Sequence, residues 1–174
     1  MFLWNIPSVT VDLDRIMDAY GTHILRVCYL YLKDYHLAQD AVQETFLRVY
    51  TRYSSFRSES SEKTWIMRIA MNICKDMMRK KSYREPPKPF SEYMEKDPDA
   101  TPEEAAVDLD ENITLLNAVE ALPEIYHQTI LLYYYSGFKA EEIAKIQKTA
   151  VSTVNVRLKR ARDMLRVSLG DEDI

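Results

Sequence analysis

The chain has 174 residues, of which 47% are hydrophobic and 29% charged, a composition typical of a globular protein of one domain or two small ones. Only three glycines and many helix-forming residues favour an all-α fold and argue against a protein built on β-sheets. The net charge of −4 excludes a uniformly basic surface, but residues 86–120 alone carry ten acidic and two basic side chains, so the two ends are mildly basic.

The positions of the cysteines, histidines and apolar runs further limit the classes of protein to which the chain can belong. Cys28 and Cys74 occupy apolar positions in helical patterns, which predicts buried, reduced core residues. The three histidines lack metal-ligand spacing with these cysteines, so no metal site is expected. The N-terminus has no basic residue before Arg15, and the longest later uncharged run, residues 125–138, is too short to cross a bilayer. We therefore expect a cytoplasmic protein.

Two helices are predicted in the first third of the chain. Apolar residues keep a helical period from about Val11 to Lys33, and a second pattern runs from about His36 to Tyr53. One side of the second helix carries two carboxylates, an amide and a leucine at spacings of i, i+3, i+4 and i+7: Asp40, Gln43, Glu44 and Leu47. This mixture suits docking onto a basic partner helix, and an ordinary solvated face fits the spacing equally well.

Residues 56–81 are predicted to form a polar loop headed by Phe56 that runs into a third helix, whose start either Ser60 or Ser61 can cap. Its apolar stripe repeats every four residues and consists of Trp65, Ile69, Ile73 and Met77. A different side carries Arg68, Asn72, Lys75 and Arg79. Three cations and an amide can hold phosphates and contact base edges, while a solvated basic face is the plain alternative.

The middle of the chain reads as a linker followed by new helices. Residues 86–102 contain five of the seven prolines and no helical period. Thr101 opens a capping box that predicts a helix to about Ala121, and Leu122-Pro123 breaks it. The next helix is expected to end near Gly137 and to pack four residues inward: Ile125, Thr129, Leu132 and Tyr133.

The last part of the chain has the pattern of a helix-turn-helix. A short helix (140–146) is followed by a tight turn and a longer helix (about 152–169). The longer helix presents an apolar residue among polar ones on its outer side, with flanking arginines: Asn155, Val156, Lys159 and Arg160, flanked by Arg157 and Arg162. An outward valine among cations fits a DNA major groove, where a thymine methyl offers an apolar contact. A plain helical hairpin with a basic surface is the alternative.

Taken together, four stretches resemble a bacterial RNA polymerase sigma factor of the extracytoplasmic-function (ECF) group within the sigma-70 family. They are residues 40–50 (DAVQETFLRVY), 56–81, 122–144 and 152–162. The resemblance implies an all-α protein of two small domains, a region 2 helical bundle and a region 4 helix-turn-helix. The boundaries it implies are residues 1–85 for region 2, residues 86–102 for the acidic, proline-rich linker, and residues 103–174 for region 4.

The resemblance also implies a function. The protein would be a transcription initiation factor without enzymatic activity, catalytic residues or cofactor. It would bind core RNA polymerase through the β′ clamp and the β flap, bind promoter DNA, and be held by an anti-sigma factor, which in many members is membrane-bound. The polymerase-binding residues would be Asp40, Gln43, Glu44 and Leu47. The residues at the minus-ten element would be Phe56, Ser58, Ser60, Ser61, Arg68, Asn72, Lys75 and Arg79. Those at the minus-thirty-five element would be Thr153, Asn155, Val156, Arg157, Lys159, Arg160 and Arg162.

The chain departs from the family pattern around the helix-turn-helix. Lys148 stands where the turn usually has a glycine, and Ala150 and Lys139 stand where serine caps are common. Thr149 or Ser152 is expected to cap the last helix instead.

Two other classes of function are consistent with parts of the sequence. A stand-alone helix-turn-helix regulator would bind duplex DNA without polymerase, and a protein-interaction module would dock its basic faces onto an acidic partner. An enzyme is disfavoured because we find no glycine-rich phosphate loop, no nucleophile beside a base and no metal constellation.

Overall fold

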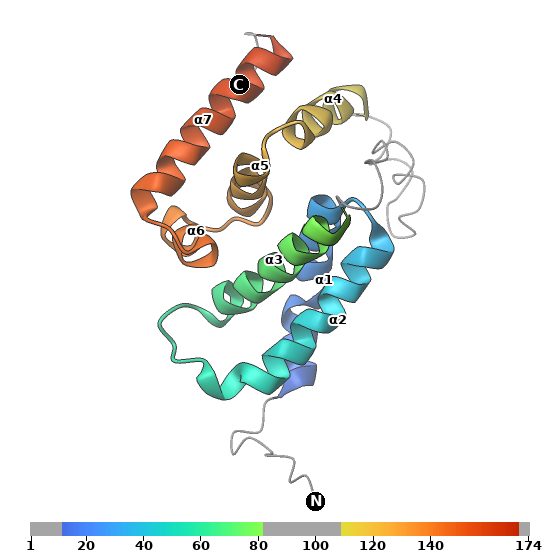
Figure 1. The fold of residues 1–174 in the computed structure, drawn as a ribbon, viewed down its shortest axis with the longest axis vertical. Helices are drawn as coiled ribbons and strands as arrows, with labels where there is room; N and C mark the ends of the chain where they lie inside the picture. The colour runs from blue at the N-terminus through green and yellow to red at the C-terminus, as the bar shows by residue number, and fades with distance from the viewer. Residues whose placement is uncertain (1–11, 82–108, 171–174) are drawn as a thin grey trace, which may run out of the picture.

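The computed structural model describes residues 12–81 and 109–170, and within these ranges the chain is built from helices without a β-strand (Figure 1). The all-α prediction is confirmed. The first three helices form an N-terminal body: α1 (Leu13–Leu32), α2 (Tyr35–Arg52) and α3 (Glu62–Lys81). The other helices form a C-terminal body: α4 (Leu109–Glu120), α5 (Glu124–Ile130), α6 (Ala140–Gln147) and α7 (Val151–Leu169). The predicted linker and the predicted cap at Thr101 lie outside the described residues.

Side-chain caps fix the start of each helix in the N-terminal body. The Asp12 carboxylate accepts the Arg15 N–H at 3.0 Å and opens α1. The Asp34 carboxylate accepts the Leu37 N–H at 3.1 Å and opens α2. At α3 the cap is Ser61, whose hydroxyl oxygen accepts the Thr64 N–H at 3.1 Å. Each cap satisfies a backbone donor that has no partner inside its helix.

The core of the N-terminal body contains both cysteines, as predicted. Cys28 of α1 and Cys74 of α3 are fully buried and free, with their sulfur atoms 3.4 Å apart. The hydrogen bond between the two thiols and their burial raise the pKa of Cys74, so this residue stays a thiol.

The buried side of α3 is broader than the predicted stripe. Trp65 and Ile73 are buried as expected, but Met67 and Met71 are also only 1% exposed. These methionines follow Lys63 at i+4 and i+8 and so share its side of α3, and the Lys63 ammonium donates to the Ser136 carbonyl of the C-terminal body at 3.4 Å. A three-helix bundle alone gave no reason to expect apolar residues there.

In the C-terminal body the packing prediction for the α5 segment is half wrong. Thr129 and Leu132 are fully buried, whereas Ile125 is 47% and Tyr133 38% exposed. After α5 the helix continues as a π-helical turn, η4 (Leu131–Tyr135), closed by the Ser136 N–H donating to the Leu131 carbonyl at 3.0 Å. The wider turn shifts the register within 131–135, so Tyr133 leaves the face that the 3.6-residue period predicts. Ile125 lies before the turn, and this shift does not explain its exposure.

The two bodies are in direct contact. Figure 1 shows α5 and α6 lying over the N-terminal bundle, and α3 contacts α6. At one end, the Tyr31 hydroxyl donates to Glu124 at 2.7 Å and Lys33 pairs with Glu120 at 3.0 Å. The Tyr31 ring also stacks on His127, with ring centroids 5.8 Å apart. These contacts join α1 to α4 and α5.

Acid should weaken this contact through His127. Burial, followed by the charge of Lys33, lowers the pKa of His127 to about 4 from its usual 6.5. The depressed pKa means that the neutral imidazole stabilises the folded protein above pH 6.5 and that this contribution is lost as the pH falls from 6.5 toward 4. At pH 5 we expect a loss of about 2 kcal/mol relative to pH 7.5.

The measurement is the free energy of unfolding by urea at both pH values. His127→Gln should remove about 2 kcal/mol of the pH dependence. Equal pH dependence in wild type and His127→Gln would contradict the prediction.

Candidate functional site

The first candidate surface, which we call the acidic face, lies on α2. Asp40 and Gln43 are exposed and Leu47 is 58% exposed, on the side of α2 opposite to the buried Ala38 and Ala41. Glu44 is half-buried and accepts a hydrogen bond from Arg48 at 2.7 Å. Leu47 is exposed one turn beyond Glu44, so an apolar side chain shares this face with two carboxylates, the combination that the sequence predicts for a docking surface.

The second surface is an aromatic pocket at the loop between α2 and α3. Phe56 and Trp65 have ring centroids 5.3 Å apart, and Tyr53 lies 5.9 Å from the first and 6.0 Å from the second. The pocket has a volume of about 320 Å³. Its lining from the N-terminal body is Ser55, Phe56, Arg57, Glu59, Ser60, Trp65 and Arg68. An aromatic wall beside two guanidinium groups can hold a nucleic-acid base and its phosphate.

Glu62 and its two hydrogen-bond donors set the geometry of this loop. Glu62, in the first turn of α3, accepts hydrogen bonds from Arg15 at 2.8 Å and from the Tyr53 hydroxyl at 2.5 Å. The Arg15 guanidinium is the main cause that lowers the pKa of the Glu62 carboxyl. Glu62 therefore ties α1 to the aromatic cluster. From the sequence, only the position of Glu62 in the first turn of α3 could be predicted, and its hydrogen bonds to Arg15 and Tyr53 could not.

The predicted minus-ten residues are spread along the loop and α3. Ser58 is exposed with a left-handed φ of 58°, and Ser60 lines the pocket, whereas Ser61 is taken up by the α3 cap. Further along α3, Asn72 is exposed, Lys75 is half-buried and Arg79 forms an ion pair with Asp76. Arg68 lines the pocket and also belongs to the cationic side of α3, so the pocket and this side form one continuous surface.

The third surface is α7, the second helix of the helix-turn-helix. Val156 is 49% exposed, and Lys159 and Arg160 are exposed beside it, as predicted. Thr153 and Arg157 are half-buried, and Arg157 donates to the Gln147 side chain at 2.8 Å. Arg157 thus braces the turn between α6 and α7.

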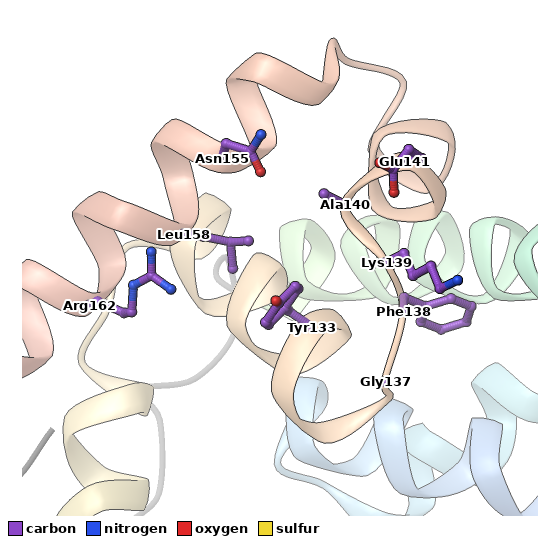
Figure 2. Close-up of a pocket in the computed structure, with 9 residues that line it drawn as sticks. All are labelled: Tyr133, Gly137, Phe138, Lys139, Ala140, Glu141, Asn155, Leu158 and Arg162. Atoms are coloured by element: carbon purple, nitrogen blue, oxygen red, sulfur yellow. The ribbon is translucent and has the colours of Figure 1, made fainter.

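Figure 2 shows that two other predicted residues, Asn155 and Arg162, line a pocket between α7 and the 133–141 segment. This pocket has a volume of about 560 Å³, and Leu158 contributes to it from α7 between them. Arg162 donates to the Tyr134 hydroxyl at 3.3 Å. The predicted minus-thirty-five residues therefore include Asn155 and Arg162, which line this pocket although both are exposed, and Val156, which does not line it.

The departures from the family pattern have structural consequences. Lys148 takes the left-handed conformation, with a φ of 52°, which a glycine would adopt without strain. Lys139 has no capping side chain, but its N–H donates to Glu142 at 3.0 Å, the reciprocal half of a capping box. The α7 N-cap is Ala150, without a side-chain hydrogen bond, so the expectation that Thr149 or Ser152 would cap this helix is wrong.

Restoring that cap should stabilise the C-terminal body. Ala150 has φ −76° and ψ 150°, the extended conformation that capping residues adopt. We expect Ala150→Ser to raise the free energy of unfolding by about 1 kcal/mol, because the serine oxygen can accept an unpaired N–H of the first turn. Urea unfolding followed by circular dichroism measures this gain. Ser152→Ala serves as the control, and an equal stability change in both variants would show that capping is not the cause.

The described residues contain no group of three or more metal-ligating side chains that could hold an ion. Nor does any described helix have the length and apolar character needed to cross a membrane.

A basic helix-turn-helix in one body, and an aromatic pocket beside a cationic helix in the other, define a DNA-binding protein. Residues 16–84 match the family model for Sigma-70 region 2, and residues 113–165 match that for Sigma-70, region 4. The chain is 34% identical to the ECF RNA polymerase sigma factor SigW of Bacillus subtilis over 164 residues, which are 90% of this chain and 88% of that protein. The chain belongs to the ECF sigma factors of the sigma-70 family.

Further relatives agree with this assignment. The chain is 34% identical over 134 residues to the ECF RNA polymerase sigma-E factor of Haemophilus influenzae, covering 72% of this chain and 71% of that protein. Among solved structures, the sigma factor RpoE in complex with the anti-sigma factor NepR, from Bartonella quintana, has a TM-score of 0.69 at 23% identity and covers 91% of this chain and 96% of that one. CnrH, solved with the cytosolic domain of CnrY, has a TM-score of 0.68 at 18% identity, and the match covers 92% of this chain and 89% of CnrH. At these identities the structural likeness establishes the fold.

Proposed function

We propose that this sigma factor binds core RNA polymerase and directs it to specific promoters, with residues 1–85 acting at the minus-ten element and residues 103–174 at the minus-thirty-five element. Residues 86–102 would be the linker between them. The observation that carries the proposal is the aromatic pocket, which is continuous with the cationic side of α3. A surface that offers stacking and phosphate contacts together suits single-stranded DNA.

At the minus-ten element, the proposed role of Phe56 is to stack on a base that has left the duplex. Arg68 would hold the phosphate of that nucleotide, and its position in the lining of the same pocket supports this role. Asn72, exposed one turn further along α3, would read the edge of a neighbouring base, and Lys75 and Arg79 would hold phosphates. Ser58 and Ser60 would contribute hydroxyl groups from the loop, next to the capping residue Ser61.

The proposed base capture is too weak to open DNA by itself. Unstacking costs about 1.4 kcal/mol per step, so a bubble of about ten steps costs roughly 14 kcal/mol. Stacking a base on an aromatic residue returns about 1–3 kcal/mol. The remaining free energy must come from polymerase, which is why the proposal requires a docking surface. The acidic face of α2 provides one with the charge and the exposed leucine that a basic helix of the β′ clamp would need.

At the minus-thirty-five element, α7 would enter the major groove with the side chains of Val156, Lys159 and Arg160 facing the base edges. We expect Arg160→Ala to cost about 1–3 kcal/mol of binding and to relax the preference at one base pair. Arg162→Ala should instead weaken binding evenly and lower the salt slope by about one unit, as loss of a phosphate contact does. Holoenzyme affinities for promoters that differ at single minus-thirty-five positions measure both effects. An even effect of both variants would mean that Arg160 does not read a base.

We also propose that the protein acts in the cytoplasm, where polymerase works, and that an anti-sigma factor, which in many family members is membrane-bound, holds it inactive. The test of the main proposal is co-purification of core RNA polymerase with the tagged chain from a bacterial lysate, followed by run-off transcription from a mapped promoter. Copurifying β and β′ subunits and a specific start site are expected. Tight duplex binding without polymerase would favour a stand-alone regulator instead.

A further inference from the structure

The aromatic pocket gathers more positive charge than any promoter contact proposed above requires. Lys145 and Lys148 of α6 complete its wall, next to Arg57 and Arg68 of the N-terminal body. Four cationic side chains therefore line one pocket of about 320 Å³, and Glu59 is the one acidic residue of the lining. The site is strongly cationic although the whole chain has a net charge of −4.

The protein itself leaves most of these cations without a counter-charge. Within residues 12–81 and 109–170, Arg57, Arg68 and Lys148 form no ion pair. The Lys145 ammonium donates to the Glu59 carbonyl at 2.5 Å, and an ammonium group has two further N–H donors. Like charges held close together repel one another, so an anion in the pocket would be attracted by all four groups.

A phosphate of a DNA strand does not match this charge. The phosphodiester between two nucleotides carries one negative charge, and the proposed function assigns it to Arg68. A terminal phosphate carries about −1.5 to −2, and a chain of two or three phosphates carries more. The charge of the pocket thus fits the phosphate chain of a free nucleotide better than it fits a continuous strand.

The aromatic side of the pocket supplies the other half of a nucleotide site. Phe56 is half-buried and its ring centroid lies 5.3 Å from that of Trp65, so its open face can stack on a base. Ser55 and Ser60 line the pocket too, and their hydroxyls can bond ribose or phosphate oxygens. The volume lies at the lower end of the range for small-molecule sites, about 300–1,000 Å³, which suits a ligand of one nucleotide.

We propose that the aromatic pocket binds a free nucleoside di- or triphosphate, with its base on Phe56 and its phosphates between the arginines of the N-terminal body and the lysines of α6. This assignment goes beyond the proposed function, because it gives the pocket a second, diffusible ligand. The nucleotide occupies the place of the minus-ten base, so it lowers the apparent affinity of the chain for single-stranded DNA by mass action.

Isothermal titration calorimetry of the full chain without polymerase tests the ligand class. The probes are ATP, adenosine, inorganic tripolyphosphate and the dinucleotide ApA, which offers bases with a single diester charge and stands for a DNA strand. We expect ATP to bind at a single site, and adenosine and ApA to bind at least about tenfold more weakly because they lack the phosphate chain. Tripolyphosphate should bind about fivefold or more weakly than ATP, since it lacks the stacked base.

Lys148→Gly tests the contribution of α6. It removes one cation of the pocket, and glycine suits the left-handed φ of 52° at this position. We expect ATP to bind about fivefold more weakly, as for the loss of one ion pair, and Lys148→Arg to bind ATP as the wild type does. Lys139→Ser is the matched control, because it removes the same charge from the same body at an exposed position outside the pocket, where a serine can cap α6.

Phe56→Leu and Phe56→Tyr locate the base. The leucine variant should weaken ATP about fivefold or more and leave tripolyphosphate unchanged, whereas the tyrosine variant should bind both as the wild type does. Circular dichroism checks that each variant is folded.

Several results would overturn the inference. They are no binding of ATP, equal affinity for ATP and tripolyphosphate, or unchanged ATP affinity in Phe56→Leu. Equal affinity for ATP and ApA would mean that the pocket serves a strand alone. Equal losses in Lys148→Gly and Lys139→Ser would trace the binding to overall charge, and both of these results also overturn it. The proposed function is tested separately, with holoenzyme on a promoter, and it does not depend on any of these outcomes.

Discussion

Reversing the charges of Asp40 and Glu44 together is expected to abolish promoter-directed transcription. Both residues lie on the acidic face of α2 beside Leu47, which is 58% exposed although it is apolar. Removing one member of a desolvated charge pair at an interface costs about 2–5 kcal/mol. The Asp40→Lys, Glu44→Lys variant adds repulsion to that loss, so its affinity for core polymerase should fall by roughly 100-fold or more.

The control for this variant lies on α1, where Asp14 and Asp18 have the same i, i+4 spacing and are both exposed. Lysines at positions 14 and 18 change the net charge equally but should leave the affinity near that of wild type. Affinity is measured by titrating labelled sigma factor with core enzyme, and transcription by run-off synthesis. Were the acidic-face variant as active as the α1 control, polymerase would have to bind another surface, and the proposed role of the acidic face would be wrong.

Structural features that depend on local chemistry could be predicted from the sequence. The helical part of residues 56–81 could be predicted, because the serine cap and the apolar period are properties of that segment alone: Ser61, one of the two predicted caps, opens α3. The exposure of Asp40, Gln43 and Leu47 followed from the same period. The helix-turn-helix was equally visible, since Ile143, Val154 and Leu158 have the spacing that locks two helices together, and all three are buried.

Features that depend on contacts between distant residues were not predictable. The π-helical turn at 131–135 has no period of its own, so the exposure of Tyr133 could not be foreseen. Met67 and Met71 are buried on the stripe of α3 that faces the C-terminal body, and nothing in the α3 sequence specifies that neighbour. For the same reason the sequence did not reveal that Lys145 and Lys148 line the aromatic pocket.

The aromatic pocket itself leads to the second large effect. Phe56→Ala should slow the formation of open promoter complexes by a factor between about 5 and 150, which corresponds to the 1–3 kcal/mol of one base stacked on an aromatic residue. The ring has no other large role in the core, because Phe56 is only partly buried and the neighbouring Trp65 is held by Tyr53 as well. Holoenzyme assembly should therefore be normal, and the defect should appear after polymerase has bound.

A template with a permanently mismatched minus-ten region distinguishes base capture from a folding defect. On such a template the strands are already separate, so Phe56→Ala should regain most of its activity, whereas a misfolded protein would remain inactive on both templates. Phe56→Tyr keeps the aromatic face and should retain the wild-type rate. Phe56→Leu keeps most of the volume without the aromatic ring and should resemble the alanine variant. If leucine were as good as tyrosine on duplex promoters, Phe56 would act by filling space next to Trp65 rather than by stacking on DNA.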